Sequence, residues 1–250
     1  MNALPDSLDE PLALPPLPWR AARRNRQQLK QRGPFLLVTS AHPSLQEHRL
    51  GPHLHPQLGR LLQPRHTSSA EATAAARLPW AADNDCFQGL DPQAYYRMLD
   101  RLAPLAENCL WVSVPDVVGD TVETARRFEL WAEACKRRGL PAALVAQDGL
   151  EGMGRWLDRS WHRIDCLFMG GTTAWKEGLL AAALAREAQA RGIWVHWGRV
   201  NSKRRFDLLC ATGALDSFDG TQFARFRHTH LDKGLGWAHS EWQARLWRPR

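Results

Sequence analysis

The chain from about residue 109 onward alternates short apolar runs with longer segments of helical periodicity, and this alternation limits the fold more than any other feature. The continuous apolar run at 109–114 is typical of a strand covered on both faces. The segment 121–138 has one apolar helical face, begins with a capping pair at Asp120 and Glu123, and ends at Gly139. Strands that alternate with helices over short connections predict a parallel sheet with helices outside it.

The same pattern extends over most of the chain. We predict strands at 35–39, 78–83, 109–114, 142–146, 164–169, 193–197 and 217–220, with a less clear eighth near 60–63. We predict helices at 92–102, 121–138, 152–157, 174–191, 202–212 and 240–247. An open doubly wound sheet is an alternative, but no GxGxxG follows the first strand. The length of 250 residues suits a TIM-type (β/α)8 barrel of the α/β class, which is the expected fold.

The first 33 residues differ in composition from the rest. Residues 1 to about 17 are rich in proline and leucine, and residues 19–33 hold six basic side chains and no acidic one. We therefore expect a Pro-rich and basic N-terminal arm, 1–33, and a barrel, 34–250, that ends in a short helix. The arm does not resemble a secretion signal, and no apolar run reaches the roughly 20 residues that span a bilayer. We expect a soluble, cytoplasmic protein.

Positive charge is gathered in three groups. The formal net charge is +7, a surplus that is common among nucleic-acid-binding proteins. The groups are Arg20, Arg23, Arg24 and Arg26 in the arm, then Arg199, Lys203, Arg204 and Arg205, and finally Arg225 and Arg227. Each group is either a solvated face or a set of phosphate contacts. The second and third groups flank the site described next, which favours phosphate contact.

The cysteines and histidines do not form a metal-binding pattern. Five cysteines show no CxxC spacing, so we expect free thiols. His53 and His55 stand close together, but neither a carboxylate nor a cysteine lies near them in the sequence. We expect neither a bound metal nor a cofactor. Most of the twelve tryptophans are expected to anchor the core, and some could stack on bases.

Polar side chains follow the predicted strands at their C-terminal ends, which meet at one mouth in a barrel. They include Asp83, Asp116, Gln147, Arg199 and Asp219, and the glycine pair Gly170 and Gly171 follows another strand in the same way. Taken singly, each is also typical of a turn or a helix cap. Together they suggest glycosyl transfer, in which one carboxylate attacks C1′ of a sugar and another moves protons. An aspartate and a glutamine match the edge of a purine, and a glycine pair lets the backbone approach it closely.

The order and character of these segments resemble the tRNA-guanine transglycosylase superfamily. Residues 83–88, Asp-Asn-Asp-Cys-Phe-Gln, are similar to the family's Asp-Ser-Gly-Gly-aromatic-Gln. The resemblance implies that Asp83 is the general acid/base, and that Phe87 stacks on the base with Gln88 beside it. Residues 216–219, Asp-Ser-Phe-Asp, are similar to the family's Asp-Met-Phe-Asp, which implies that Asp219 is the nucleophile.

The resemblance runs from about residue 35 to residue 225 and includes the base-binding positions. It implies that Asp116 and Gln147 read the base and that Gly170 and Gly171 lie against it. Trp197 stands where the family has the methionine that closes the base sandwich. The chain departs from the family at positions 85 and 86, where Asp and Cys replace glycines.

The family's C-terminal zinc subdomain is not expected, because the 25 residues after Arg225 include no cysteine. In this respect the chain resembles the compact phage-type DNA transglycosylases. The expected activity is exchange of guanine in DNA for a 7-deazaguanine such as preQ0, through a covalent glycosyl-aspartate. The alternatives are a tRNA enzyme that lacks the zinc module, a non-catalytic nucleic-acid-binding partner subunit, and an unrelated barrel enzyme.

Overall fold

The computed structural model describes residues 18–39, 55–65, 68, 77–225 and 230–247, with the backbone alone for residues 18–24, 224 and 225. In this part of the chain eight parallel strands follow one another around a closed barrel, in which β1 also pairs with β8. They are β1 (Phe35–Thr39), β2 (Leu58–Leu62), β3 (Trp80–Ala82), β4 (Cys109–Ser113), β5 (Ala142–Ala146), β6 (Cys166–Met169), β7 (Trp194–Trp197) and β8 (Ser217–Asp219). The predicted (β/α)8 barrel is confirmed, and the strand that the sequence left unclear is β2, Leu58–Leu62.

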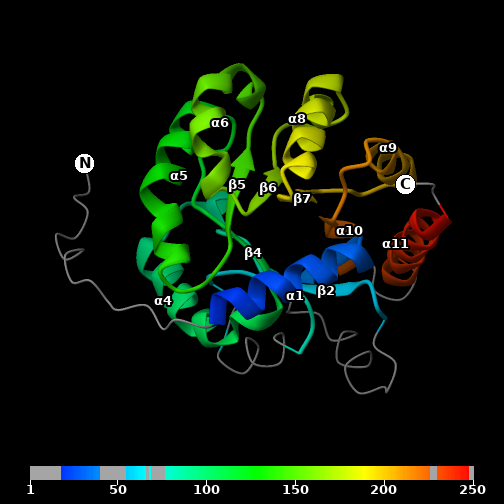
Figure 1. The fold of residues 1–250 in the computed structure, drawn as a ribbon, viewed down its shortest axis with the longest axis horizontal. Coiled ribbons are helices and arrows are strands. Elements are labelled where there is room, and N and C mark those ends of the chain that lie inside the picture. Colours follow the sequence, from blue (N-terminus) through cyan, green and yellow to red (C-terminus); the bar gives the residue numbers. More distant parts are fainter. Residues whose placement is uncertain (1–17, 40–54, 66–67, 69–76, 226–229, 248–250) are drawn as a thin grey trace.

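Helices surround the strands (Figure 1). The longer ones are α1 (Pro18–Arg32), α4 (Pro92–Leu102), α5 (Thr121–Lys136), α6 (Gly154–Ser160), α8 (Leu179–Ala190), α9 (Lys203–Ala211) and α11 (His230–Trp247). The short ones are α7 (Thr173–Lys176), α10 (Thr221–Arg225), η1 (Cys86–Gln88), η2 (Ala103–Asn108), η3 (Leu150–Met153) and η4 (Trp161–Arg163). Across the described ranges, every helix is too short or too polar to cross a membrane.

Side-chain caps place helices directly after the strand ends. The Asp120 carboxylate accepts a hydrogen bond from the Glu123 N–H at the start of α5, as predicted. Ser202 does the same for the Arg205 N–H at the start of α9, also as predicted. Such caps satisfy backbone donors that the first helical turn leaves unpaired. They therefore fix where each helix turns away from the mouth.

Two helices differ from the sequence prediction. The segment predicted as one helix over 174–191 is divided at Gly178 into α7 and α8. The C-terminal helix begins at His230, ten residues before the predicted start at 240. Gly234 and Gly236 weaken the helical pattern in the sequence, but a Cβ at Gly234 would lie only 2.6 Å from the Phe223 ring. Gly234 thus lets α11 approach the barrel closely.

Side chains of each strand alternate between the barrel interior and the layer beneath the helices. In β7, Trp194 and His196 face the interior, whereas Val195 and Trp197 pack under the helices. The interior cluster consists of Leu29, Phe35, Leu37, Leu61, Ala81, Leu110, Trp111, Ala143, Val145, Cys166, Phe168 and Trp194. The barrel is therefore filled by side chains below its mouth, as is usual for this fold.

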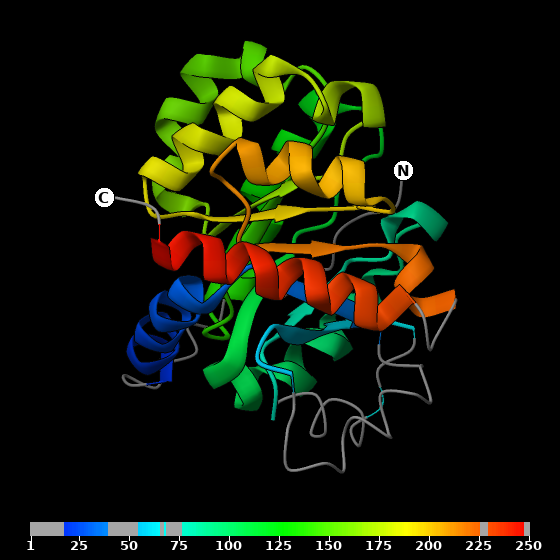
Figure 2. The same cartoon turned by 90° about the vertical axis from the view of Figure 1, so that its right-hand side faces the viewer.

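Helix α1 closes the N-terminal end of the barrel, here called the floor. Figure 2 shows α1, in blue, at the end where β7 and β8 begin. Leu29 of α1 is buried in the interior cluster. Asn25 donates to the Glu107 carbonyl (2.8 Å) just before β4, and the Lys30 ammonium donates to the Ile193 carbonyl (2.5 Å) just before β7. This part of the basic arm is thus integrated into the barrel, at the end opposite the mouth.

Candidate active site

A pocket of about 370 Å3 lies at the mouth and is lined by residues from the ends of all eight strands. Its volume falls in the range of about 300–1,000 Å3 that is usual for small-molecule sites. Of the residues predicted from the sequence, the pocket brings together Asp83, Phe87, Gln88, Asp116, Gln147, Gly170, Arg199 and Asp219. The convergence expected of a barrel mouth is therefore observed.

Asp219 ends β8 and has 18% of its side chain exposed in the pocket. Its Oδ1 accepts a hydrogen bond from the Arg199 backbone N–H (2.7 Å), and its Oδ2 lies 3.3 Å from Nε2 of His196. Burial by itself would raise the pKa of Asp219. The contact with His196, the Arg199 N–H and the nearby Lys176 ammonium outweigh this and hold its pKa below the ordinary value. Asp219 is therefore kept as a carboxylate.

Asp83 follows β3 directly and faces the same pocket. Its Oδ1 accepts hydrogen bonds from the Asn84 N–H (2.8 Å) and the Ser113 hydroxyl (3.2 Å). Burial, the negative charge of Asp219 and, to a smaller extent, that of Asp116 raise the pKa of Asp83 to about 7. Two carboxylates whose pKa values are driven apart by their surroundings form the usual pair of proton donor and nucleophile.

His196 lies behind Asp219, and the sequence reasoning gave it no role. Its ring packs between Trp111 (centroids 4.6 Å apart) and Phe168 (4.5 Å), and burial lowers its pKa. Trp194 Nε1 donates to Ser217 Oγ (2.8 Å), which lies 2.9 Å from His196 Nδ1. Because an indole N–H only donates, the Ser217 hydroxyl hydrogen can go to Nδ1, which leaves Nε2–H directed at Asp219. Alternation from Trp194 along β7 is the sequence signal that would have found His196.

A connected set of amides and one carboxylate forms the polar side of the pocket. Gln147 Nε2 donates to Asp116 Oδ2 (2.7 Å), and Asn84 Nδ2 donates to Asp116 Oδ1 (2.9 Å). The Gly119 N–H donates to Gln147 Oε1 (3.0 Å), which fixes the orientation of the glutamine amide. Asp116 keeps lone pairs and Gln147 keeps one N–H for a ligand. This acceptor–donor arrangement matches the N1–H, N2–H and O6 edge of guanine. Asn84 is an addition that the sequence reasoning did not identify.

Phe87 stands on the rim of the pocket with 79% of its surface exposed. The turn that carries it begins at Asp85, whose φ is 57°, and ends at Gly89 with φ 92°. Arg65 Nη2 donates to the carbonyls of Gln88 (3.3 Å) and Gly89 (2.8 Å), which holds the turn. An exposed aromatic ring at the rim of a pocket is suited to stacking on a flat ligand.

Trp197 does not reach the pocket, so its assignment to the base sandwich is wrong. It is fully buried, and its Nε1 donates to the Ala214 carbonyl (2.7 Å) under the helices. The physical reason is strand alternation: His196 faces the interior, and its neighbour Trp197 must face outward. The interior aromatic residue that lines the pocket is Phe168 of β6.

The glycine pair after β6 allows close packing of the strand ends and also leaves room at the pocket. A Cβ at Gly170 would lie 2.6 Å from Val145 Cγ1, so only glycine fits there. The N–H groups of Gly170 and Gly171 both donate to the Ala146 carbonyl (3.0 and 2.9 Å), and their carbonyls accept from Arg199 Nη2 (2.6 Å each). Gly170 lines the pocket, whereas Gly171 lies behind it rather than against a ligand.

The basic residues after β7 are joined to acidic partners. Arg204 and Arg205 both bind Glu177 (2.7 and 2.8 Å), and Lys203 binds Asp207 (2.5 Å). Arg204 and Lys203 are exposed, whereas Arg205 is half-buried and links the loop after β7 to the end of α7. The side chains of Arg20, Arg23, Arg24 and Arg225, and the residues Arg227 and His53, lie outside the described residues.

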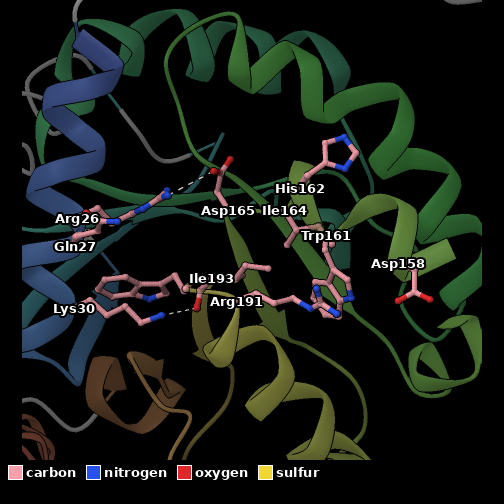
Figure 3. A pocket seen from close by; sticks show the side chains of 12 residues that line it. Arg26, Gln27, Lys30, Asp158, Trp161, His162, Ile164, Asp165, Arg191 and Ile193 are labelled. Carbon is pink, nitrogen blue, oxygen red and sulfur yellow. Dashed lines mark hydrogen bonds and ion pairs between the residues drawn. The ribbon is translucent and has the colours of Figure 1, made fainter. Parts of the chain in front are cut away.

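A second pocket, of about 450 Å3, lies at the floor beside α1 (Figure 3). Arg26 and Lys30 of α1 form one wall; Arg26 Nη2 lies 3.5 Å from Asp165 Oδ1, and Lys30 Nζ lies 3.2 Å from Asp216 Oδ2. The structure thus places Arg26 at the end opposite the mouth. The predicted nucleic-acid contact of Arg26 would therefore lie at the floor, where Leu29 anchors α1, and it stays a prediction.

Metal-ligating residues do not gather in the described part of the chain: no group of three or more His, Cys, Asp or Glu side chains there is placed to hold an ion. All five cysteines are free thiols, as predicted. Four are buried, and Cys86 at the pocket is half-buried. Burial raises the pKa of Cys86 to about 12, with a contribution from the charge of Asp116, so this thiol stays protonated.

The fold and the mouth pocket define a TIM-type (β/α)8 barrel with a carboxylate-lined site. Among solved structures, the chain is similar to deoxyribose phosphate aldolase from Aeropyrum pernix, with 15% identity and a TM-score of 0.51 over 81% of this chain and 92% of that one. It is similar to malate synthase from Haloferax volcanii, with 14% identity and a TM-score of 0.51 over 86% and 73% of the two chains. Likeness at such identities shows the fold alone. No protein-family model and no curated protein sequence matches the chain.

Proposed function

We propose that this protein is an enzyme, a transglycosylase that exchanges guanine in DNA for a 7-deazaguanine through a covalent glycosyl-aspartate. The observation that carries the proposal is the pair of carboxylates at one mouth. Asp219 has a pKa below its ordinary value, and Asp83 has a pKa of about 7. One group is therefore ionised and ready to attack, and the other can hold or release a proton near neutral pH.

In the first step, Asp219 attacks C1′ of a guanosine whose base has been flipped into the pocket. A bond forms between C1′ and a carboxylate oxygen, and the C1′–N9 bond breaks. The electron pair of that bond stays on guanine, which takes a proton from Asp83. His196 and the Arg199 N–H hold the two Asp219 oxygens, so the attacking group is positioned before substrate arrives.

In the second step, a 7-deazaguanine replaces guanine in the pocket. Asp83, now ionised, accepts the N9 proton of the entering base. N9 then attacks C1′, and the bond from C1′ to Asp219 breaks. Both carboxylates return to their starting states, so the cycle needs neither an oxidant nor a nucleotide. Asp116 and Gln147 read the same edge of both bases, which explains how one pocket accepts each in turn.

The choice of polymer rests on charge near the mouth. The exposed Lys203 and Arg204 begin α9, a few residues along the chain from the pocket residue Arg199. Side chains of this type bind the phosphates that flank a flipped nucleotide. We propose DNA as the partner. The test must distinguish modification of DNA from modification of tRNA.

The test is incubation of the protein with 7-cyano-7-deazaguanine and, in separate reactions, duplex DNA, single-stranded DNA or tRNA, followed by nucleoside mass spectrometry. We expect the 7-deazaguanine nucleoside in DNA and an equal amount of released guanine. Asp219→Asn should abolish both products and any covalent protein–DNA adduct. Asp100→Asn is the matched control, because Asp100 is an exposed carboxylate of α4 outside the pocket, and it should keep full activity.

Modified nucleoside in tRNA alone would replace DNA by tRNA and leave the chemistry standing. Full activity in the Asp219→Asn variant would overturn the nucleophile. Absence of exchange in all three polymers would refute the proposed function.

A further inference from the structure

The Arg199 side chain crosses from the end of β7 to the end of β6 along the edge of the pocket. Its Nη2 donates to the carbonyls of Gly170 and Gly171, at 2.6 Å each. Its backbone has φ 61°, a left-handed conformation that non-glycine residues rarely adopt, and its N–H holds Asp219. Arg205 Nη1 donates to the Arg199 carbonyl (2.9 Å) and fixes the loop from behind. The guanidinium is thus held in place before a ligand arrives.

The order of these residues around the barrel matches the order of groups around a guanine ring. Asp116, Gln147, Gly170, Arg199 and Asp219 follow or end β4, β5, β6, β7 and β8, and all line the pocket. Guanine presents, in the same cyclic order, the N2–H and N1–H donors, the O6 acceptor, position 7, and N9 with its sugar. With the first edge at Asp116 and Gln147 and the sugar at Asp219, position 7 faces Gly170 and Arg199.

This side of the pocket is electropositive. The Arg199 guanidinium has further N–H groups besides the two that bind carbonyls. Lys176 lies behind it, 2% exposed, and donates to the Gly198 carbonyl (2.5 Å). Burial and, to a smaller extent, the charge of Arg199 lower the pKa of Lys176 to about 8. The carbonyls of Gly170 and Gly171 each already accept from Arg199, so the N–H groups that remain on the guanidinium are the charged donors on this side.

We infer that Arg199 selects the substituent on the entering 7-deazaguanine, favouring a neutral hydrogen-bond acceptor such as a nitrile over a protonated aminomethyl group. The inference rests on the proposed function, because it takes the ligand to be a 7-deazaguanine. A nitrile nitrogen accepts from the guanidinium without displacing it. An ammonium would meet the fixed charge of Arg199 beside both glycine carbonyls, where the two cations repel each other. Arg199 is then a specificity residue of the pocket rather than a phosphate contact.

The test measures binding of 7-cyano-7-deazaguanine and 7-aminomethyl-7-deazaguanine to the protein alone, by calorimetry. The wild type should bind the nitrile about 10- to 100-fold more tightly, the value of a hydrogen bond to a charged group. Arg199→Gly keeps the N–H to Asp219 and suits φ 61°, and it should reduce the ratio to within about 3-fold. Arg126→Gln removes an exposed arginine of α5 outside the pocket and should leave the ratio unchanged.

The ratio of the two dissociation constants is measured within each variant, so a loss of affinity that affects both bases equally does not change it. Thermal unfolding shows that each variant is folded. Equal binding of the two bases by the wild type, or an unchanged ratio in Arg199→Gly, would overturn the inference. Selective binding of the nitrile without exchange into any nucleic acid would support Arg199 as the selecting residue and overturn the proposed function instead. Failure of both bases to bind would overturn both.

Discussion

Both ends of the barrel carry a pocket lined by charged side chains, but the charges are arranged in opposite ways. At the mouth, Asp83 and Asp219 are held close enough that the charge of Asp219 helps to raise the pKa of Asp83 to about 7. At the floor, Lys30 of α1 lies 3.2 Å from the buried Asp216. Like charges are thus brought together where a reaction would use them, and opposite charges are paired where the barrel is closed.

Substitutions at the mouth should change chemistry and leave the fold intact or more stable, because like charges there oppose folding. Substitutions at the floor should lower stability and leave the chemistry of each folded molecule unchanged. A single variant that lowers both equally would break the distinction.

After the complete loss expected for Asp219→Asn, the largest effect is expected for Asp83→Asn, which removes the proton donor. Exchange should fall by about 10²- to 10⁴-fold, the usual value of a positioned acid or base. In the wild type the rate should fall as pH rises through about 7, because Asp83 must be protonated for guanine to leave. This fall in rate with rising pH, the alkaline limb of the pH profile, should be missing in the Asp83→Asn variant. Initial rates of labelled-base incorporation between pH 5 and pH 9 measure both; a wild-type limb that persists in Asp83→Asn would assign it to another group.

The next effect is expected at the floor for Leu29→Ala. Leu29 is 5% exposed in the interior cluster, so its truncation leaves a cavity that the rest of the barrel cannot fill. The free energy of unfolding should fall by about 2–5 kcal/mol. Urea unfolding measures the loss, and the rate of exchange per folded molecule should match that of the wild type. A large fall in that rate with stability intact would place Leu29 in the chemistry instead.

A matched pair on α1 sharpens the description of the floor. Lys30→Met leaves Asp216, which is 0% exposed, without its cation, and should cost on the order of 1–3 kcal/mol of unfolding free energy. Arg26→Met removes a longer contact, 3.5 Å, to the half-exposed Asp165, and should cost less than about 1 kcal/mol. Thermal unfolding of both variants shows which of the two substitutions lowers the stability more. Equal costs would mean that burial of the acidic partner does not decide the strength of these contacts.

The smallest effect concerns the stability of Asp83→Asn. The pKa of Asp83 is raised in the folded protein, so the folded state binds the proton more tightly than the unfolded chain. The stability associated with this group is present at acidic pH and is lost as pH rises from about 4 to about 7. The variant should therefore unfold a few degrees above the wild type at pH 8, where about 1 kcal/mol corresponds to roughly 2–4 °C. The difference should shrink at pH 4.5; a larger gain at pH 4.5 would reverse the sign of the pKa shift.

The sequence predicted the barrel well because its strands are short apolar runs and several helices have clear caps. Leu58–Leu62 was the weakest strand, since Arg60 interrupts its apolar run although the side chain is buried. The helix over 230–247 was predicted too short because two glycines suggest a loop, and only its packing on Phe223 shows why one of them is needed.

The sequence predicted most residues of the candidate site but not the role of every one. Asp83, Asp116, Gln147 and Asp219 lie together because each follows or ends a strand, which can be derived from the sequence pattern. The choice of Trp197 failed because a shift of one residue along a strand exchanges the interior for the outer face. The same shift of one residue is the reason that the sequence prediction gave His196 no role.

What the sequence determined by itself was the succession of strands and the polar group that follows each one. In a closed parallel barrel that succession is also the order around the mouth, so it needs no tertiary information. The tertiary structure alone decided three things: the opposite pKa shifts of Asp83 and Asp219, the position of His196 behind the nucleophile, and the reach of Arg199 to Gly170. The reason is that electrostatic effects depend on distance and burial across strands that are far apart in the chain.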